Sequence, residues 1–179
     1  MSEARAVPER GHGRLAAVVR RLHRLGHVLV AADDPGAEDV RALLARHLAF
    51  NHEQSPPEDV HALDLEGQLD PAVAFFSARA DGRLVAIGAL KELDRHHAEV
   101  KSMHTVEAAR RQGVARAMVD HLVAIARSRA YQQVSLETGA SDAYAPARSL
   151  YASAGFVTCG PFGSYAASPN SEFMTLLLG

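Results

Sequence analysis

The chain has 179 residues, which suits one domain with a single core. Hydrophobic residues make up 47% and charged residues 22%, and this composition excludes a mainly disordered chain. The net charge of −2 gives no electrostatic case for a nucleic-acid partner, and the single cysteine, Cys159, excludes an intramolecular disulfide and a cysteine-rich zinc site. Because no apolar run could span a bilayer and no signal-peptide core is present, we expect a cytoplasmic protein without a membrane partner.

Residues 1–26 are predicted to be a basic N-terminal extension. They hold six arginines against two glutamates, a net charge of +4, so the remaining residues carry −6. The apolar residues that recur there at helical spacing are Leu15, Val18, Val19, Leu22 and Leu25. We therefore expect a loose tail over residues 1–11 and an amphipathic helix over residues 12–25, ended by Gly26. Docking of this helix on the body is favoured over a membrane-surface or anion-binding helix, or an extension without function.

From residue 27 onward, strand-like and helix-like patterns follow one another without a repeat or a linker. The expected strands are residues 27–32, 72–80, 83–91, 97–105, 132–137, 156–159 and 172–178. The expected helices are residues 37–50, a short helix or turn within 58–69, a helix that begins at 114, and residues 146–154. The pair Asp81-Gly82 predicts a tight hairpin between the second and third strands. Residues 27–179 are thus expected to form one α+β or mixed α/β domain.

A basic segment with one glycine, Arg110-Arg111-Gln112-Gly113-Val114-Ala115-Arg116, lies between a predicted strand and a predicted amphipathic helix. The first N–H groups of a helix lack internal partners, and the helix dipole adds positive charge there. Gly113 allows an anion to approach the backbone closely, so we predict that the segment holds a diphosphate. It matches neither the nucleoside-triphosphate P-loop nor the dinucleotide-binding glycine pattern. An ordinary helix start with solvated arginines is the alternative interpretation.

Three segments carry a family resemblance. Residues 110–115 look like a (Gln/Arg)-x-x-Gly-x-(Gly/Ala) motif, and residues 147–156 resemble an Ala-x-x-Leu-Tyr-x-x-x-Gly-Phe signature. Together with residues 98–105, which resemble a fourth strand, they occur in the order and spacing of the GNAT family, the Gcn5-related N-acetyltransferases. The resemblance covers residues 27–179 and implies a twisted mixed sheet of about seven strands flanked by helices. It further implies a bacterial small-molecule enzyme that transfers an acetyl group from acetyl-CoA to a primary amine by direct attack in a ternary complex.

The resemblance also implies roles for single residues. The backbone of Met103, His104 and Thr105 would bind the pantetheine arm of acetyl-CoA, because the fourth strand of the family splays away from the fifth. Tyr151 would protonate the departing thiolate; a tyrosine that only packs in the core is the alternative. Glu99 would be the general base, or else a strand-face carboxylate paired with a cation. Two further candidate bases are Glu137 and His104. Where the family often has an asparagine for pantetheine, this chain has Tyr144.

The resemblance also implies that the acceptor binds between residues 51–69 and 162–170, whose acidic and aromatic side chains favour a small cationic amine. The tentative substrate residues are His61, Asp64 and Phe162; ordinary polar loops would look the same. The ten histidines show no zinc-hydrolase spacing, so we expect no metal. A non-catalytic acyl-CoA sensor or interaction module is the alternative function. Dimers are common for such domains, but the sequence reveals no interface.

Overall fold

The computed structural model describes residues 23–25 and 28–179. The predicted tail and the predicted helix up to residue 22 lie outside the described residues. At its C-terminal end the helix prediction is wrong, because residues 23–25 form strand β1 (His23–Leu25). This strand pairs antiparallel with β2 (Val28–Ala32), and His23 lies opposite Val30. Pairing with the open edge of β2 outweighs the helical spacing of the three residues.

The described strands form one sheet, whose order is β1-β2-β3-β4-β5-β6-β8-β7. The strands that follow β2 are β3 (Val73–Ala80), β4 (Arg83–Glu92), β5 (His97–Thr105), β6 (Gln133–Gly139), β7 (Val157–Cys159) and β8 (Ser171–Leu177). Neighbouring strands are antiparallel except β5 and β6, which are parallel. The predicted mixed α/β class is confirmed, and β1 is the strand beyond the seven that were expected.

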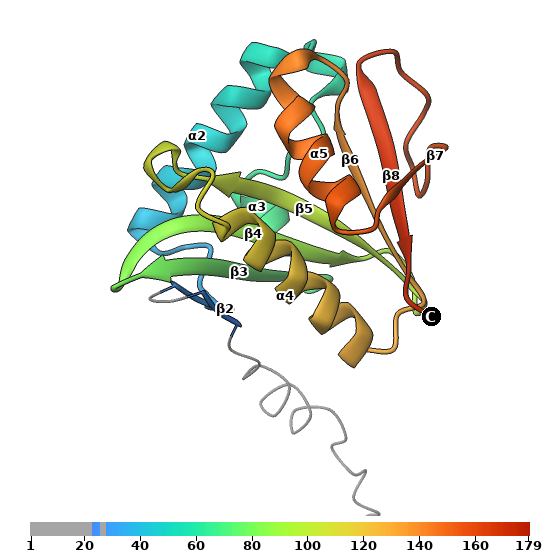
Figure 1. The fold of residues 1–179 in the computed structure, drawn as a ribbon. Coiled ribbons are helices and arrows are strands. Elements are labelled where there is room, and N and C mark those ends of the chain that lie inside the picture. Colours follow the sequence, from blue (N-terminus) through green and yellow to red (C-terminus); the bar gives the residue numbers. More distant parts are fainter. Residues whose placement is uncertain (1–22, 26–27) are drawn as a thin grey trace, which may run out of the picture.

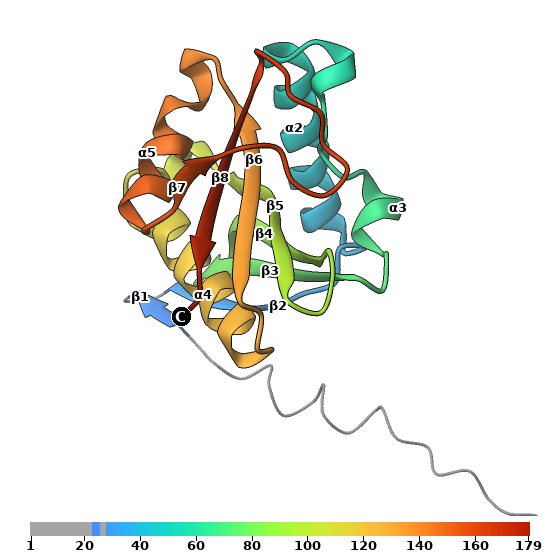
Figure 2. The ribbon, with the colours of Figure 1, turned by 90° about the vertical axis from the view of Figure 1, so that its right-hand side faces the viewer.

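Helices cover both faces of the sheet. The helices are α2 (Glu38–Gln54), α3 (Leu65–Gln68), α4 (Val114–Ser128) and α5 (Ala145–Ser153), and the 3-10 turns are η1 (Pro57–Asp59), η2 (Glu107–Ala109) and η3 (Asp142–Tyr144). Figure 2 shows α2 and α3 on one side of the sheet and α4 and α5 on the other. Within the part of the chain that the structure describes, no helix has the length and apolarity needed to cross a membrane.

Each face has its own apolar core. On one face α4 packs its apolar side onto the sheet, and Met118 and Leu122 are completely buried there. On the opposite face α2 packs Val40 and Leu43 against residues of β3 and β4. Burial on both faces fixes the central strands rigidly, so that the strand ends can hold functional groups in place.

The predicted hairpin between β3 and β4 is confirmed. Asp81 has φ 49° and Gly82 has φ 80°, and Ala80 lies directly opposite Arg83. Two successive left-handed residues make the type of two-residue turn that matches the twist of the flanking strands. The local sequence therefore determined both the turn and the register of this pair.

Candidate functional site

Strands β5 and β6 meet at one end and diverge toward the other (Figure 1). Their parallel pairing covers three positions, His97 with Gln133, Ala98 with Val134 and Glu99 with Ser135, and ends there. The predicted splay is thus confirmed. Beyond it, the side of β5 that faces β6 has backbone groups without a strand partner, which an extended amide-containing ligand could bind as an added strand. We call this gap the split.

A bulge in β5 explains the divergence. Ser102 has a left-handed φ of 56°, and the β4–β5 register shifts between Ile87 and Ala89. An extra residue on one strand bends it and increases its twist. Between the shifted positions lies Gly88, where an added Cβ would stand 2.8 Å from Met103 Sδ. The buried Ser102 hydroxyl accepts a hydrogen bond from Gln68 of α3, and this bond holds the bulge from the α2 and α3 side of the sheet.

The loop that enters α4 has the conformation expected of an anion-binding turn. Gly113 precedes the helix with φ 80°, Arg111 has φ 60°, and no side chain caps the first turn of α4. The helix therefore begins with free backbone N–H groups, and these favour an anion. Gln112 and Arg110 are exposed, and Arg110 Nε donates to Thr105 O at 3.2 Å, which ties the loop to the end of β5.

The side chains of the predicted diphosphate segment divide into two groups. Those of Arg110, Arg111, Gln112 and Arg116 are exposed, and Ala115 is partly exposed. Val114 is buried against the core, so only its backbone can face a ligand. The segment thus offers guanidinium groups and backbone N–H groups together, as the sequence predicted for a diphosphate.

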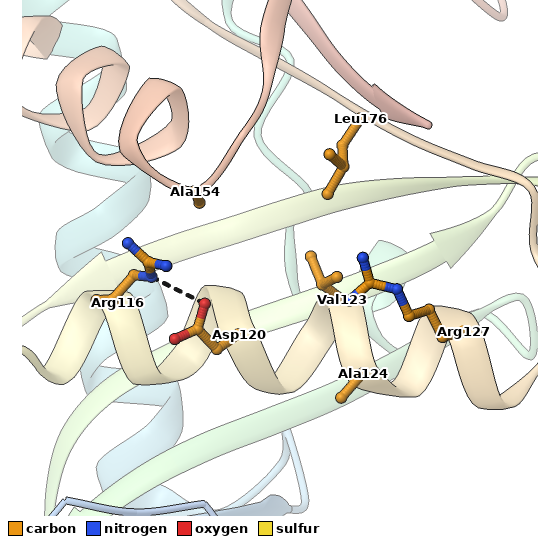
Figure 3. A pocket seen from close by; sticks show the side chains of 7 residues that line it. All are labelled: Arg116, Asp120, Val123, Ala124, Arg127, Ala154 and Leu176. Atoms are coloured by element: carbon orange, nitrogen blue, oxygen red, sulfur yellow. Dashed lines mark hydrogen bonds and ion pairs between the residues drawn. The ribbon is translucent and has the colours of Figure 1, made fainter. Parts of the chain in front are cut away.

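A pocket of about 520 Å³ lies along α4 on the outside of this region (Figure 3). It is lined by Arg116, Asp120, Val123, Ala124, Arg127, Ala154 and Leu176. Arg116 Nε bonds Asp120 at 2.8 Å, and Arg116 Nη1 bonds the carbonyl of Ser153 at 3.2 Å. The pocket shares Arg116 with the predicted diphosphate segment but contains none of the predicted catalytic residues.

Tyr151 of α5 lies in the core on the α4 side of the sheet. Tyr151 is 6% exposed, and its ring makes an edge contact with the ring of Phe156, with 5.9 Å between the ring centres. Burial raises the pKa of the phenol, and the charge of Glu137 raises that pKa further. The hydroxyl therefore keeps its proton at neutral pH. Both the packing role and the proton-donor role that the sequence left open are compatible with this position.

Glu99 lies on the opposite face and is already paired. Lys101 Nζ is 3.2 Å from Glu99 Oε1 and donates to Tyr165 Oη at 2.7 Å, and the Tyr165 hydroxyl donates to Glu99. Lys101 Nζ also donates to the carbonyl of His61 at 2.9 Å. Burial, together with the charge of Glu99, raises the pKa of Tyr165. The cation partner that the sequence analysis considered for Glu99 is thus present, and it is Lys101.

Glu137 lies two residues beyond Ser135, the last position of β6 that pairs with β5, and it is still paired with Phe173 of β8. Its face is shared with Ser135, whose hydroxyl is 2.8 Å from His97 Nε2. Burial raises the pKa of Glu137, while the Ser171 hydroxyl and the charges of His61 and Lys101 oppose the rise. Among the described residues no ion pair engages its carboxylate, so Glu137 differs from Glu99 in being available to a ligand.

The two segments predicted for the acceptor meet next to this carboxylate. The rings of His61 and Tyr165 stand edge to face at 4.9 Å, and Phe162 contacts Tyr165 at 5.1 Å. Asn170 Nδ2 donates to Asp59 Oδ2 at 2.8 Å, which links the same segments at the surface. Asp64 does not join them, because it is exposed and caps α3 by accepting from Gly67 N.

Helix α2 adds residues that the sequence analysis missed. The rings of His47 and His104 lie 5.5 Å apart, and burial lowers the pKa of both, that of His47 to about 4. Tyr144 donates from its hydroxyl to Asn51 Oδ1 at 2.9 Å and packs on Gly139 at the open end of β6. The only available signal was that residues 47 and 51 are one helical turn apart.

The chain resembles known proteins over most of its length. Residues 37–156 match the model of the acetyltransferase (GNAT) family. The chain belongs to the GNAT family of acetyltransferases. The N-acetyltransferase YsnE of Bacillus subtilis is 44% identical over 146 residues, which cover 82% of this chain and 97% of that protein. The recognition of the family and of an acyltransferase from the sequence is confirmed.

Solved structures agree on the fold. The structure of an acyl-CoA N-acyltransferase from Klebsiella pneumoniae has a TM-score of 0.70 and 25% identity, covering 85% of this chain and 98% of that one. The structure of a GNAT acetyltransferase from Elizabethkingia anophelis, which contains acetyl-CoA, has a TM-score of 0.61 and 14% identity, covering 86% of this chain and 99% of the other. In the described part of this chain, histidine, cysteine and acidic side chains form no group of three that could hold a metal ion.

Proposed function

We propose that this GNAT enzyme transfers an acetyl group from acetyl-CoA to the primary amine of a small molecule, by direct attack in a ternary complex. The observation that carries the proposal is the split between β5 and β6, which lies next to an uncapped helix N-terminus with exposed arginines. A free strand edge suits the amides of a pantetheine arm, and the helix N-terminus suits a diphosphate. The family membership and the acetyl-CoA in the Elizabethkingia structure support the same cofactor.

The reacting groups would approach from opposite faces of the sheet. Tyr151 lies in the core on the α4 side, whereas Glu99 and Glu137 lie on the side of α2 and α3. An amine that enters on the α2 side would attack the thioester carbon in the split, where a backbone N–H of β5 would stabilise the oxyanion. The thiolate would leave toward Tyr151, which holds a proton.

Calorimetry and thiol release test this proposal. Acetyl-CoA should bind the full-length protein with measurable heat and should raise its melting temperature, because a ligand of the folded state stabilises that state. Free thiol should then appear when a small primary amine is added. If acetyl-CoA gives neither heat nor thermal protection, the proposal is wrong.

A cytoplasmic location stays a prediction of the sequence.

A pair of glycine variants assigns the binding to the loop before α4. Gly113→Asp should abolish acetyl-CoA binding, because it places a bulky anion where the diphosphate is expected. Gly82→Asp is the matched control: Gly82 has the same φ of 80° but lies in the β3–β4 turn. Normal acetyl-CoA affinity in Gly113→Asp, or an equal loss in both variants, would contradict the loop assignment.

A further inference from the structure

The charges beside the split do not cancel. Lys101 stands against Glu99 at 3.2 Å, and Arg148 of α5 stands against Glu172 of β8 at 3.2 Å. Each of these pairs is neutral overall. Glu137 remains as a carboxyl group without an ion-pair partner among the described residues, so this part of the site has one net negative charge whenever Glu137 is ionised.

Lys101, whose charge acts on Glu137, is occupied by the protein itself. An ammonium group has three N–H donors, and Lys101 Nζ has three oxygen neighbours, on His61, Tyr165 and Glu99. The side chain of Lys101 is 9% exposed, so it is also screened from solvent and ligands. A ligand carboxylate would therefore find no free donor on this residue.

Arg148 is engaged in the same way. Its Nη1 donates to the carbonyls of Gly139 at 2.7 Å and Ser141 at 2.9 Å, and its Nε faces Glu172. The charges of Arg46 and Arg110 act on His104 and, like that of Arg148, are not among those that shift the pKa of Glu137. Lys101 and Arg148 are thus both committed to protein groups before any substrate arrives.

The groups that interact with Glu137 through charge or hydrogen bonding come from several elements. On its own side of the sheet they are Glu99 and Lys101 of β5, His61 after η1, Tyr144 of η3, Tyr165 of the β7–β8 loop and Ser171 of β8. Its charge also reaches Tyr151 on the opposite side. Two of the groups on its own side are phenols, which have aromatic rings and neutral hydroxyl groups. Aromatic faces attract a cation, and Lys101 Nζ already stands 5.4 Å from the ring centre of Tyr165.

We propose, on the basis of the proposed function, that the acceptor is a simple amine without a carboxylate beside its amino group, and that its ammonium binds to Glu137. Glu137 then takes one proton from the ammonium nitrogen. The neutral nitrogen attacks, the C–N bond forms and the C–S bond breaks. The nitrogen loses a second proton as the intermediate collapses; one proton ends on the sulfur through Tyr151, and the other is released to solvent. Glu99 serves as a positioning residue that holds Lys101 and Tyr165.

Matched pairs of an amino acid and its decarboxylated amine test the proposal. The pairs are tyrosine and tyramine, histidine and histamine, lysine and cadaverine, and arginine and agmatine, each with saturating acetyl-CoA and free-thiol detection. In at least one pair kcat/KM should be at least about tenfold higher for the amine, since a carboxylate would be repelled by Glu137 and would lack a counter-ion. Equal or better use of the amino acids overturns this inference and leaves the proposed function intact. If acetyl-CoA binds but no compound of any pair releases thiol, the inference falls together with the small-amine part of that function.

A variant assigns the preference to Glu137 itself. Glu137→Gln should keep acetyl-CoA binding, lower kcat/KM for the amine about 100-fold, and reduce the preference for amine over amino acid. Glu38→Gln, the same change at an exposed carboxylate of α2 outside the two acceptor segments, should leave all three unchanged. If Glu137→Gln does not fold, Glu137→Asp keeps the charge and should keep the preference at a lower kcat. A preference that is unaltered in Glu137→Gln, or lost in Glu137→Asp, overturns the assignment.

Discussion

The environment of Tyr151 decides what its phenol can do. Apolar packing and the charge of Glu137 both disfavour the phenolate, so the hydroxyl stays protonated until a strong base forms next to it. A thiolate produced in the same buried surroundings would meet the same penalty, because desolvation disfavours every anion there. Proton transfer from Tyr151 to sulfur would therefore remove a buried negative charge as soon as it develops.

Tyr151→Phe tests this role. The substitution keeps the ring and its contact with Phe156 but removes the hydroxyl. We expect kcat to fall about 100-fold, in the range usual for loss of a general acid, with unchanged affinity for acetyl-CoA. Thiol release at saturating acetyl-CoA and calorimetry measure the two quantities. An unchanged kcat would leave Tyr151 with the packing role alone.

His47 should make stability depend on pH. Burial, assisted by the charges of His104 and Lys101, lowers the pKa of His47 from 6.5 to about 4 in the folded state. The unfolded chain therefore binds more protons between these values, and folding is weakened as pH falls from about 6.5 to about 4. The shift corresponds to a loss on the order of 2–3 kcal/mol across that window.

His47→Gln isolates this effect. Gln has no proton to bind, so the variant should lose less free energy of unfolding than the wild type between pH 6.5 and pH 4. Urea unfolding at a series of pH values gives the change of the unfolding free energy with pH for the wild type and for the variant. His52→Gln, the same change at an exposed position of the same helix, is the control. Parallel curves for His47→Gln and the wild type would show that His47 does not cause the dependence.

At the scale of elements, the open end of the split depends on Tyr144. Its ring lies against Gly139, where an added Cβ would stand 2.2 Å from Tyr144 Cδ2, and its hydroxyl binds Asn51 of α2. Tyr144 thus connects the end of β6 to the opposite helix. The family often has an asparagine for pantetheine at this position. Here Tyr144 takes its place and contacts Asn51 of α2 and Gly139 of β6.

Gly139→Ala should break this connection. The Tyr144 ring must move away, and overpacking of this kind costs about 1–3 kcal/mol of unfolding free energy. Gly160→Ala should change stability by less than about 0.5 kcal/mol, because nothing lies within 4 Å of its added Cβ. Urea unfolding of both variants provides the comparison. Equal stability of the two would mean that the ring adapts without loss.

Local signals in the sequence predicted those elements whose geometry is set by neighbouring residues. Asp81-Gly82 determined a hairpin, and Gly113 determined the start of α4, because both need a left-handed backbone that few residues adopt. The bulge at Ser102 gave no such signal. Its positive φ follows from pairing with β4 and from the bond to Gln68, two contacts that are distant in sequence.

The candidate site likewise contains some residues that the sequence pointed to and others that only contacts distant in sequence bring together. The family resemblance singled out Tyr151, Glu99 and the loop before α4, and their roles stay predictions. The engagement of Glu99 by Lys101 and Tyr165 depends on a loop 66 residues further along the chain, and no sequence pattern expresses that contact. For the same reason His47 and Asn51 of α2 were missed, since only the packing of α2 against β5 brings them to the site.

The sheet consists of two continuously paired groups of strands that are joined by only a short pairing between β5 and β6. Pairing is continuous from β1 to β5 and from β6 to β7, but between these two groups it covers only three positions. The two groups are held together by the core under α4, which contacts residues of both. Acetyl-CoA bound in the split would act as the missing strand between them.

Hydrogen exchange can locate this effect. Acetyl-CoA should slow exchange of backbone amides at Met103–Thr105 and in the first turn of α4, because the ligand covers free N–H groups at both places. Amides of the β3–β4 hairpin are already paired in the ladder, so beyond the general stabilisation of the fold they should change little. Comparison of the free and bound protein by mass spectrometry gives the pattern. Protection spread evenly over the sheet, without a local increase at these two segments, would place the ligand elsewhere on the molecule.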